Sequence, residues 1–214
     1  PHTPYEGEPR PTGAPHLAHE GEPRPTGAPH LAHEGEPRPT GAPHTPYGAE
    51  KLRAASALLA TPRLSAAWGR IFYLYGEHED PRRLVPSVAR ALVRGERARL
   101  GPGTQLADFL EAREAAAAFV ALLASEVTGV VNLGSGERRS VADVARELAA
   151  LAGRPDALDL GALPPREGEP PRLVPELGRL RDEVGFRPSR GLREGLAAAL
   201  AFWRQAEASA PAGP

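Results

Sequence analysis

The sequence predicts an α/β domain that follows a repetitive N-terminal segment. From Thr45 onward, segments with helical periodicity alternate with short β-like runs, a pattern typical of α/β proteins. Before that point the chain repeats a 14-residue unit. The folded part then has about 165 residues, which is within the ordinary size range of one domain.

The N-terminal repeat contains three copies of one unit. Residues 6–19 read EGEPRPTGAPHLAH, residues 20–33 repeat them without change, and residues 34–47 diverge only at the end, to Thr-Pro-Tyr. The unit is rich in proline and glycine and has no apolar run, so it can neither propagate a helix nor bury a core.

These patterns divide the chain into three predicted regions. We expect residues 1–42 to be a disordered low-complexity segment, residues 43–207 to be the folded region, and residues 208–214 to be a disordered tail.

The composition excludes several classes of function. With 26 basic and 27 acidic residues the net charge is -1, so neither nucleic acid nor an anionic membrane is an expected partner. No apolar run of about 18 residues and no secretory signal occur, and the default expectation is a cytoplasmic protein. The absence of cysteine rules out disulfides, thiol nucleophiles and thiolate metal ligands.

Six of the seven histidines lie in or beside the repeat. The pairs His16 with His19 and His30 with His33 could each offer two imidazoles to a metal, but no carboxylate or thiolate is placed to complete a shell. We therefore interpret them as a by-product of duplication and predict no metal site.

The first predicted helix covers residues 46–60. Thr45 can cap it, Pro46 suits its first turn, and Pro62 ends it. A β-like run at residues 69–74 follows and leads into a charged loop.

The sequence pattern in the middle of the domain predicts a helix, a short strand and a second helix. The apolar face of the first helix consists of Val85, Val88, Ala89, Leu92 and Val93. Gly95 is well placed to end it. Residues 101–109 then read as a turn into a strand, and residues 111–125 as an alanine-rich helix.

A second β-like run, residues 127–133, precedes the turn Gly134-Ser135-Gly136. Ser140 and Asp143 form a capping-box start to a helix that ends at Gly153. The remaining predicted elements are a proline-rich link at residues 164–171, a short helix around residues 177–184, and a last helix carrying Leu192, Leu196, Leu200 and Trp203.

The strand, the Gly-Ser-Gly turn and the following helix together resemble a dinucleotide-binding fingerprint. In G-x-G-x-x-G spacing, however, the third glycine is replaced by Arg139, and the helix starts late. This favours a tight turn over a phosphate cradle.

Tyr47 and Lys51 are the candidate catalytic pair. Residues four apart on a helix lie on the same face, so the phenol and the ammonium point into the same space. A phenol beside a cation can serve as a general acid or base. The spacing also occurs in many helices where both groups are simply solvated.

Several further motifs occur in a recognisable order. They are Tyr47-x-x-x-Lys51, Arg70-Ile71-Phe72-Tyr73-Leu74-Tyr75-Gly76, Arg83-Leu84-Val85-Pro86, Gly103-Thr104-Gln105 with Asp108-Phe109, Asn132-Leu133-Gly134-Ser135-Gly136, and Arg179-Leu180-x-x-Glu183-Val184-Gly185-Phe186-x-Pro188. In this order, from about Thr45 to Trp203, the chain resembles the extended short-chain dehydrogenase/reductase family, specifically the NAD-dependent nucleotide-sugar epimerases and dehydratases. The resemblance implies a partial Rossmann-like fold made of the catalytic helix and the substrate-binding lobe.

The resemblance also implies roles for individual residues. Tyr47 would exchange a proton with a sugar hydroxyl while NAD or NADP takes or returns a hydride, Lys51 would hold the nicotinamide ribose, and Phe72 would lie beside the nicotinamide. The residues implied to bind the nucleotide-sugar substrate are Tyr73, Leu84, Val85, Pro86 and Gln105. The helix carrying Tyr47 and Lys51 is also implied to form a homodimer interface.

Departures from the family pattern leave three interpretations open. The family's glycine-rich turn precedes the Tyr-x-x-x-Lys helix, where this chain has only the repeat, and Ala107 replaces an arginine suited to the substrate diphosphate. We expect a truncated epimerase/dehydratase-like protein that lacks the cofactor half and is inactive alone. The alternatives are a non-catalytic binding or assembly module and the product of a gene no longer under selection.

Overall fold

The computed structural model describes residues 46–165 and 169–209. The expectations for the repeat, including its disorder, its histidine pairs and the Thr45 cap, lie outside these residues. The elements in chain order are α1 (Pro46–Leu59), β1 (Ala67–Ile71), β2 (Tyr73–Tyr75), α2 (Leu84–Val93), β3 (Ala98–Arg99), β4 (Leu106–Glu111), α3 (Ala112–Ala124), β5 (Gly129–Leu133), β6 (Arg138–Ser140), α4 (Val141–Leu151), β7 (Leu158–Asp159), β8 (Arg172–Leu173), the π-helical turn η1 (Arg179–Glu183) and α5 (Leu192–Ser209).

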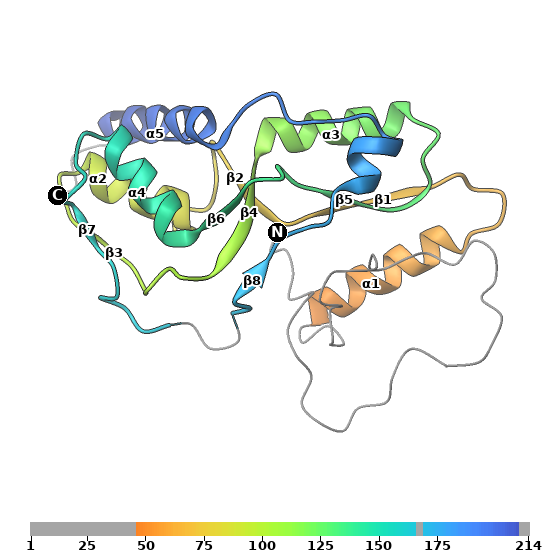
Figure 1. Cartoon of the computed structure of the whole chain (residues 1–214), viewed down its shortest axis with the longest axis horizontal. Coiled ribbons are helices and arrows are strands. Elements are labelled where there is room, and N and C mark those ends of the chain that lie inside the picture. The colour runs from red at the N-terminus through yellow and green to blue at the C-terminus, as the bar shows by residue number, and fades with distance from the viewer. Residues whose placement is uncertain (1–45, 166–168, 210–214) are drawn as a thin grey trace, which may run out of the picture.

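The first of two packed groups, which we call the β1–β5 lobe, is built on a parallel strand pair. Ala67 lies opposite Gly129 and Ile71 opposite Leu133. Figure 1 shows α3 on one side of these strands and α1 on the other. The buried residues of its core are Leu110, Ala115, Ala118, Leu122, Val131, Leu133, Leu177 and Leu180.

The second group, which we call the β4 lobe, is centred on β4. This strand pairs with β2 and β8 in parallel and with β6 antiparallel. Helices α2, α4 and α5 gather at the end of the molecule away from α1 (Figure 1). Their core includes Val88, Leu92, Val144, Leu148, Leu196 and Leu200, all buried.

The β-like run at residues 69–74 is split between the two lobes. Residues 67–71 pair with β5, and residues 73–75 pair with β4, so the pairing partner changes at Phe72. The predicted single strand is therefore corrected to two short strands on one continuous path. The reason is non-local, because the choice of neighbour strand is made by residues far along the chain.

The helix ends agree with their sequence signals. Gly95 follows α2 with φ +80°, a conformation that side chains rarely adopt. Ser140 and Asp143 form a capping box at α4, with both reciprocal bonds present. The last helix continues to Ser209, two residues past the predicted domain boundary.

Among residues 46–165 and 169–209, no helix combines the length and the apolar content needed to cross a membrane.

Candidate functional site

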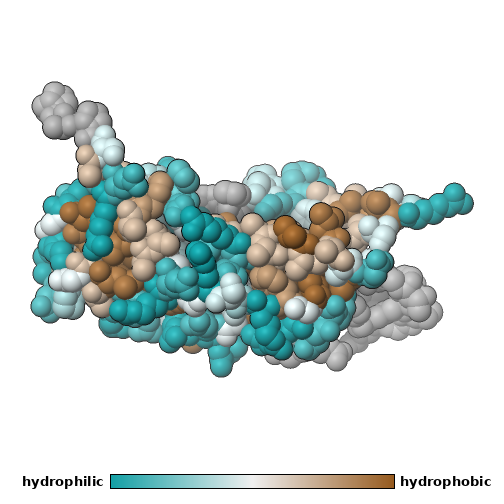
Figure 2. All heavy atoms as spheres, turned by 90° about the horizontal axis from the view of Figure 1, so that it is seen from above, coloured by the Kyte–Doolittle hydropathy of each residue, from teal (hydrophilic) through white to brown (hydrophobic). Residues whose placement is uncertain are grey.

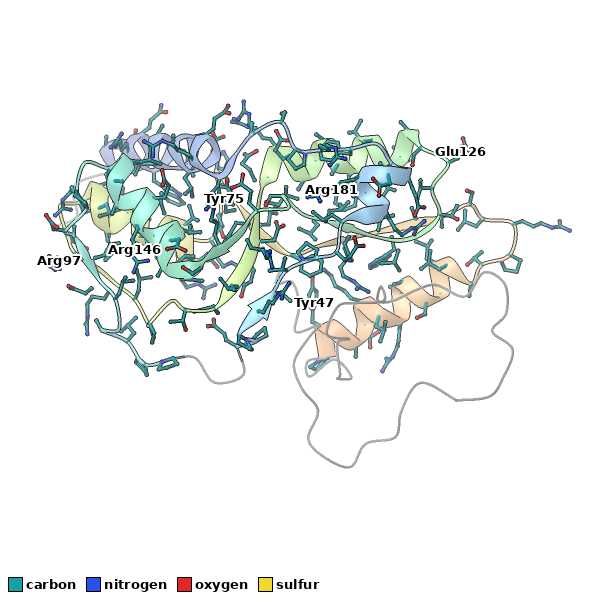
Figure 3. The ribbon with its side chains drawn as sticks, in the orientation of Figure 1. Tyr47, Tyr75, Arg97, Glu126, Arg146 and Arg181 are labelled. Atoms are coloured by element: carbon teal, nitrogen blue, oxygen red, sulfur yellow. The ribbon has the colours of Figure 1, made fainter. Side chains whose placement is uncertain are left out.

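The structure brings Tyr47 and Lys51 together on α1. The Lys51 Nζ atom lies 5.0 Å from the centroid of the Tyr47 ring, within cation–π range. Tyr47 is 47% exposed, so its phenol is open to a ligand, and Lys51 is half-buried. Figure 3 shows Tyr47 at the N-terminal end of α1. The two side chains are thus neighbours, and their acid–base role stays a prediction.

Small residues seat α1 against the rest of the β1–β5 lobe. The buried residues of this helix are Gly48 and Ala55. Because the contacts are made by residues with little or no side chain, the bulkier Tyr47 and Lys51 remain on the accessible part of the surface.

Phe72 and Tyr73 lie where the chain passes between the lobes. Phe72 is buried, with 8% of its surface exposed. Tyr73 is half-buried, and its ring stacks on Phe109 of β4 with centroids 5.3 Å apart. This stacking fixes the Tyr73 ring, whereas its predicted contact with substrate stays a prediction.

The predicted substrate residues of α2 form its first turn. Val85 and Pro86 are buried and belong to the packed interior, and Leu84 is half-buried. Neither Val85 nor Pro86 is open to a ligand in this structure. Their role in substrate binding stays a prediction.

Gln105 lies just before β4 and is half-buried. Its Nε2 atom donates a hydrogen bond of 2.8 Å to Glu169 Oε2. A substrate that used the Gln105 amide would have to compete with this carboxylate.

The turn after β5 is occupied by a protein carboxylate. The backbone N–H groups of Ser135 and Gly136 donate hydrogen bonds of 2.7 Å to Asp108 Oδ1 and Oδ2. Asp108 is fully buried. Burial raises the pKa of Asp108, and the two backbone bonds offset part of that rise. The turn amides are therefore committed, which supports the tight turn over the phosphate cradle.

The sequence pattern did not predict the structural role of Asp108. It stands in the Asp108-Phe109 motif, and its partners are 27 and 28 residues away. The one local signal is a carboxylate inside the apolar run of β4.

Glu79, in the loop between β2 and α2, binds its proton more tightly than an ordinary glutamate. Burial raises the pKa of Glu79 to about 7, against the lowering effect of Arg83. Its Oε1 atom lies 3.5 Å from Arg83 Nε, and its buried Oε2 has no hydrogen-bond partner. The sequence pattern indicated only that this loop is charged and did not single out Glu79.

No group of three or more His, Asp or Glu side chains in the described parts of the chain is placed to hold a metal ion.

Comparison with known proteins gives these residues a context. A model of the NAD dependent epimerase/dehydratase family matches residues 23–134, which is more than half of the chain. The chain belongs to the NAD-dependent epimerase/dehydratase family. The match includes Tyr47, Lys51, Phe72 and the Asn132–Gly134 segment, so the resemblance noted in the sequence is confirmed.

Among curated members of this family, the UDP-glucose 4-epimerase of Yersinia pestis is 30% identical over 187 residues, covering 75% of this chain and 54% of that protein. The UDP-glucuronic acid decarboxylase 1 of Xenopus tropicalis is 27% identical over 139 residues, covering 64% of this chain and 32% of that protein. The chain thus spans about a third to a half of the length of these relatives.

Solved epimerase/dehydratase structures share the fold. RMD from Pseudomonas aeruginosa, solved with NADPH, is 26% identical with a TM-score of 0.68, covering 77% of this chain and 57% of that one. Other structures with this fold were solved with NAD. The α/β fold of the epimerase/dehydratase structures is therefore confirmed for the described part of the chain.

Proposed function

We propose that this chain supplies the acid–base residues and the substrate lobe for NAD-dependent chemistry on a nucleotide sugar. The observation that carries this proposal is the Tyr47–Lys51 pair, with the ammonium 5.0 Å from the centre of an exposed phenol ring. In this role Tyr47 exchanges a proton with a sugar hydroxyl, and Lys51 places a positive charge beside the phenol ring.

The residues present fit one part of the dinucleotide better than the other. Tyr47 and Lys51 offer a hydroxyl and an ammonium that would hold the nicotinamide ribose, and Phe72 lies in the neighbouring chain crossing. When bound, the nicotinamide supplies hydride transfer. The pyrophosphate finds no such fit at the turn after β5, because the Ser135 and Gly136 amides already bind Asp108. We infer that groups other than this turn hold the pyrophosphate.

The substrate side of the site lies at the start of α2 and of β4. We propose that Tyr73, Leu84 and the Gln105 amide face the nucleotide sugar, and that the buried Val85 and Pro86 support Leu84 from behind. Tyr73 has its ring held by Phe109, so it presents a fixed surface. Gln105 would exchange its bond with Glu169 for one with the ligand.

Substitution of Tyr47 tests the proposal. We expect Tyr47→Phe to lose turnover of UDP- and dTDP-sugars in the presence of NAD, because the acid–base hydroxyl is gone. Arg53→Ala is the matched control on the same helix, since Arg53 is exposed and pairs only with its neighbour Glu50 among the ion pairs described. Equal turnover in Tyr47→Phe would contradict the role of the phenol.

A second candidate function is a binding or assembly module. The exposed apolar side chains of α3 favour it, with Val120 at 68% and Leu123 at 89% exposure, because a large exposed apolar patch marks interaction sites. Pulldown of a partner by the wild type that is unchanged in Tyr47→Phe would favour this second function over the first.

A further inference from the structure

Helix α1 is attached to the rest of the protein by few residues. Its buried residues are Gly48 and Ala55, whereas α2, α4 and α5 each bury five residues. Neither of the two described hydrophobic cores includes a residue of α1. The described ion pair of this helix, Arg53 with Glu50, joins two of its own residues. Little apolar surface therefore leaves water when α1 packs against the strands, and its packing is weak.

Helix α3, on the opposite side of the same strands, is attached differently. Ala115, Ala118 and Leu122 are buried in the core of the β1–β5 lobe. Figure 2, viewed from above, shows brown surface over the end of the molecule that holds α3, so this helix is apolar on its outer side as well. The two helices that cover the β1–β5 strands thus differ in that α3 is part of the core and α1 lies against it.

The connection between α1 and β1 has the features of a hinge. It consists of residues 60–66. Arg63, in its middle, has φ +63°, in the left-handed region that side chains rarely adopt. At Ala66 the chain is already tied to β5, because the carbonyl of Ala66 accepts a hydrogen bond of 2.9 Å from the Gly129 N–H group. A short connection between a helix and a fixed strand can absorb the rotation of the helix as a rigid body.

We propose that α1 swings away from the β1–β5 strands as a unit, turning about residues 60–65, while the two cores stay folded. Tyr47 and Lys51 move with it, because both lie on α1. The hinge itself rests on the contacts of α1 alone, whereas its consequence for the site rests on the proposed function. In the open position the Tyr47–Lys51 pair is withdrawn from the substrate residues of the β4 lobe.

Alkylation of single cysteines tests the hinge without background, because the chain has no cysteine. Ala55 on α1 and Ala115 on α3 are each 3% exposed, so a rigid structure would protect Ala55→Cys and Ala115→Cys equally. We expect iodoacetamide to modify Ala55→Cys about tenfold faster or more, since α1 opens without unfolding of the core. Equal rates would overturn the proposal.

Low concentrations of urea separate the hinge from unfolding of the whole protein. Opening of α1 exposes little surface, whereas exposure of Ala115 requires unfolding of the core, which exposes much more. The alkylation rate of Ala55→Cys should therefore change little with urea, and that of Ala115→Cys should rise steeply. An Ala55→Cys rate that rises as steeply would show that α1 opens only when the protein unfolds, which overturns the proposal.

A nucleotide sugar that contacts both the Tyr47–Lys51 pair and the β4 lobe would hold α1 closed. UDP-glucose with NAD should then slow the alkylation of Ala55→Cys but not that of Ala57→Cys, which is exposed on the same helix. An unchanged Ala55→Cys rate in protein that turns over UDP-glucose would overturn this closure. Absence of turnover would count against the proposed function instead, and the rates without ligand would still decide the hinge.

Discussion

At the scale of single residues, the carboxylates of Asp108 and Glu79 differ in what they stabilise. Asp108 joins β4 to the turn after β5 by two short hydrogen bonds. Glu79 holds a half-buried position in a loop with one oxygen lacking a partner. The first is fully satisfied and structural, whereas the second is poised to change its charge near neutral pH.

Asp108→Asn is expected to destabilise the protein by about 1–3 kcal/mol. An amide offers only one acceptor oxygen, so one of the two buried N–H groups, on Ser135 or Gly136, would face the Asn NH₂ group instead of an oxygen. Chemical denaturation measures the loss. Asp182→Asn, at an exposed position, is the control and should be neutral; equal stability of both variants would contradict the role given to Asp108.

The raised pKa of Glu79 predicts that the stability of the protein falls as the pH rises. The folded pKa is about 7 and the ordinary value is 4.5, so the folded state keeps the proton over that range while the unfolded state releases it. The stability that the protonated group contributes is thus full below about pH 4.5 and is lost as the pH rises through about 7.

Replacing Glu79 by Gln mimics the protonated form. We expect Glu79→Gln to be more stable than wild type by about 1–2 kcal/mol above neutral pH, after discounting for partial solvent screening. The difference should vanish in mild acid. Unfolding curves at several pH values measure it, with exposed Glu96→Gln as the control; a constant difference across the pH range would refute the assignment.

At the scale of elements, local signals were sufficient for the helices. Periodicity and end signals such as Gly95 and the Ser140–Asp143 box predicted α2 and α4 at nearly their observed positions. The split at Phe72 and the two-residue strands β3, β7 and β8 could not be predicted, because strand pairing is decided by distant residues. The hydrogen-bond partners of Asp108 could not be predicted for the same reason.

The candidate site was predictable only in part. The Tyr47–Lys51 pair follows from helical spacing alone, and the structure places the two groups together. The commitment of the Gly134–Gly136 turn to Asp108 depends on a contact between lobes, which no local pattern encodes. The substrate roles of Tyr73, Leu84, Val85, Pro86 and Gln105 stay predictions.

Packing between α3 and β1 gives a prediction at the element scale. A Cβ atom at Gly69 would overlap the ring of Phe119. Gly69→Ala should therefore displace that ring and cost about 1–3 kcal/mol through overpacking. Thermal unfolding measures the effect. Gly101→Ala is the control, because an added Cβ atom there meets no close neighbour. Gly153→Ala is unsuitable because φ at Gly153 is +72°. A stable Gly69→Ala variant would contradict the described packing.

At the scale of the whole molecule, β4 joins the two cores. Ala107 and Phe109 contribute to the core of the β4 lobe, and Leu110 contributes to that of the β1–β5 lobe. The alternation of side chains along one strand thus places neighbouring residues in different cores. We expect the two lobes to depend on each other for stability.

The two tryptophans report on the lobes separately, because Trp68 is in β1 and Trp203 packs in the β4 lobe. In each single-tryptophan variant, Trp68→Phe or Trp203→Phe, fluorescence and far-ultraviolet circular dichroism should report one coincident unfolding transition. A lobe whose fluorescence changes at lower denaturant than the dichroism would show that the cores unfold independently.

The change of strand-pairing partner at Phe72 limits how the sequence of this chain can vary during evolution. One continuous path serves both strand pairs, and the single residue between them, Phe72, belongs to neither strand. A residue inserted there would turn Tyr73 and Tyr75 to the opposite face of their strand. A deletion would shift the register of one strand pair relative to the other. The length of this junction is therefore far more constrained than its composition, and related chains should differ in side chain at the crossing but never in residue number.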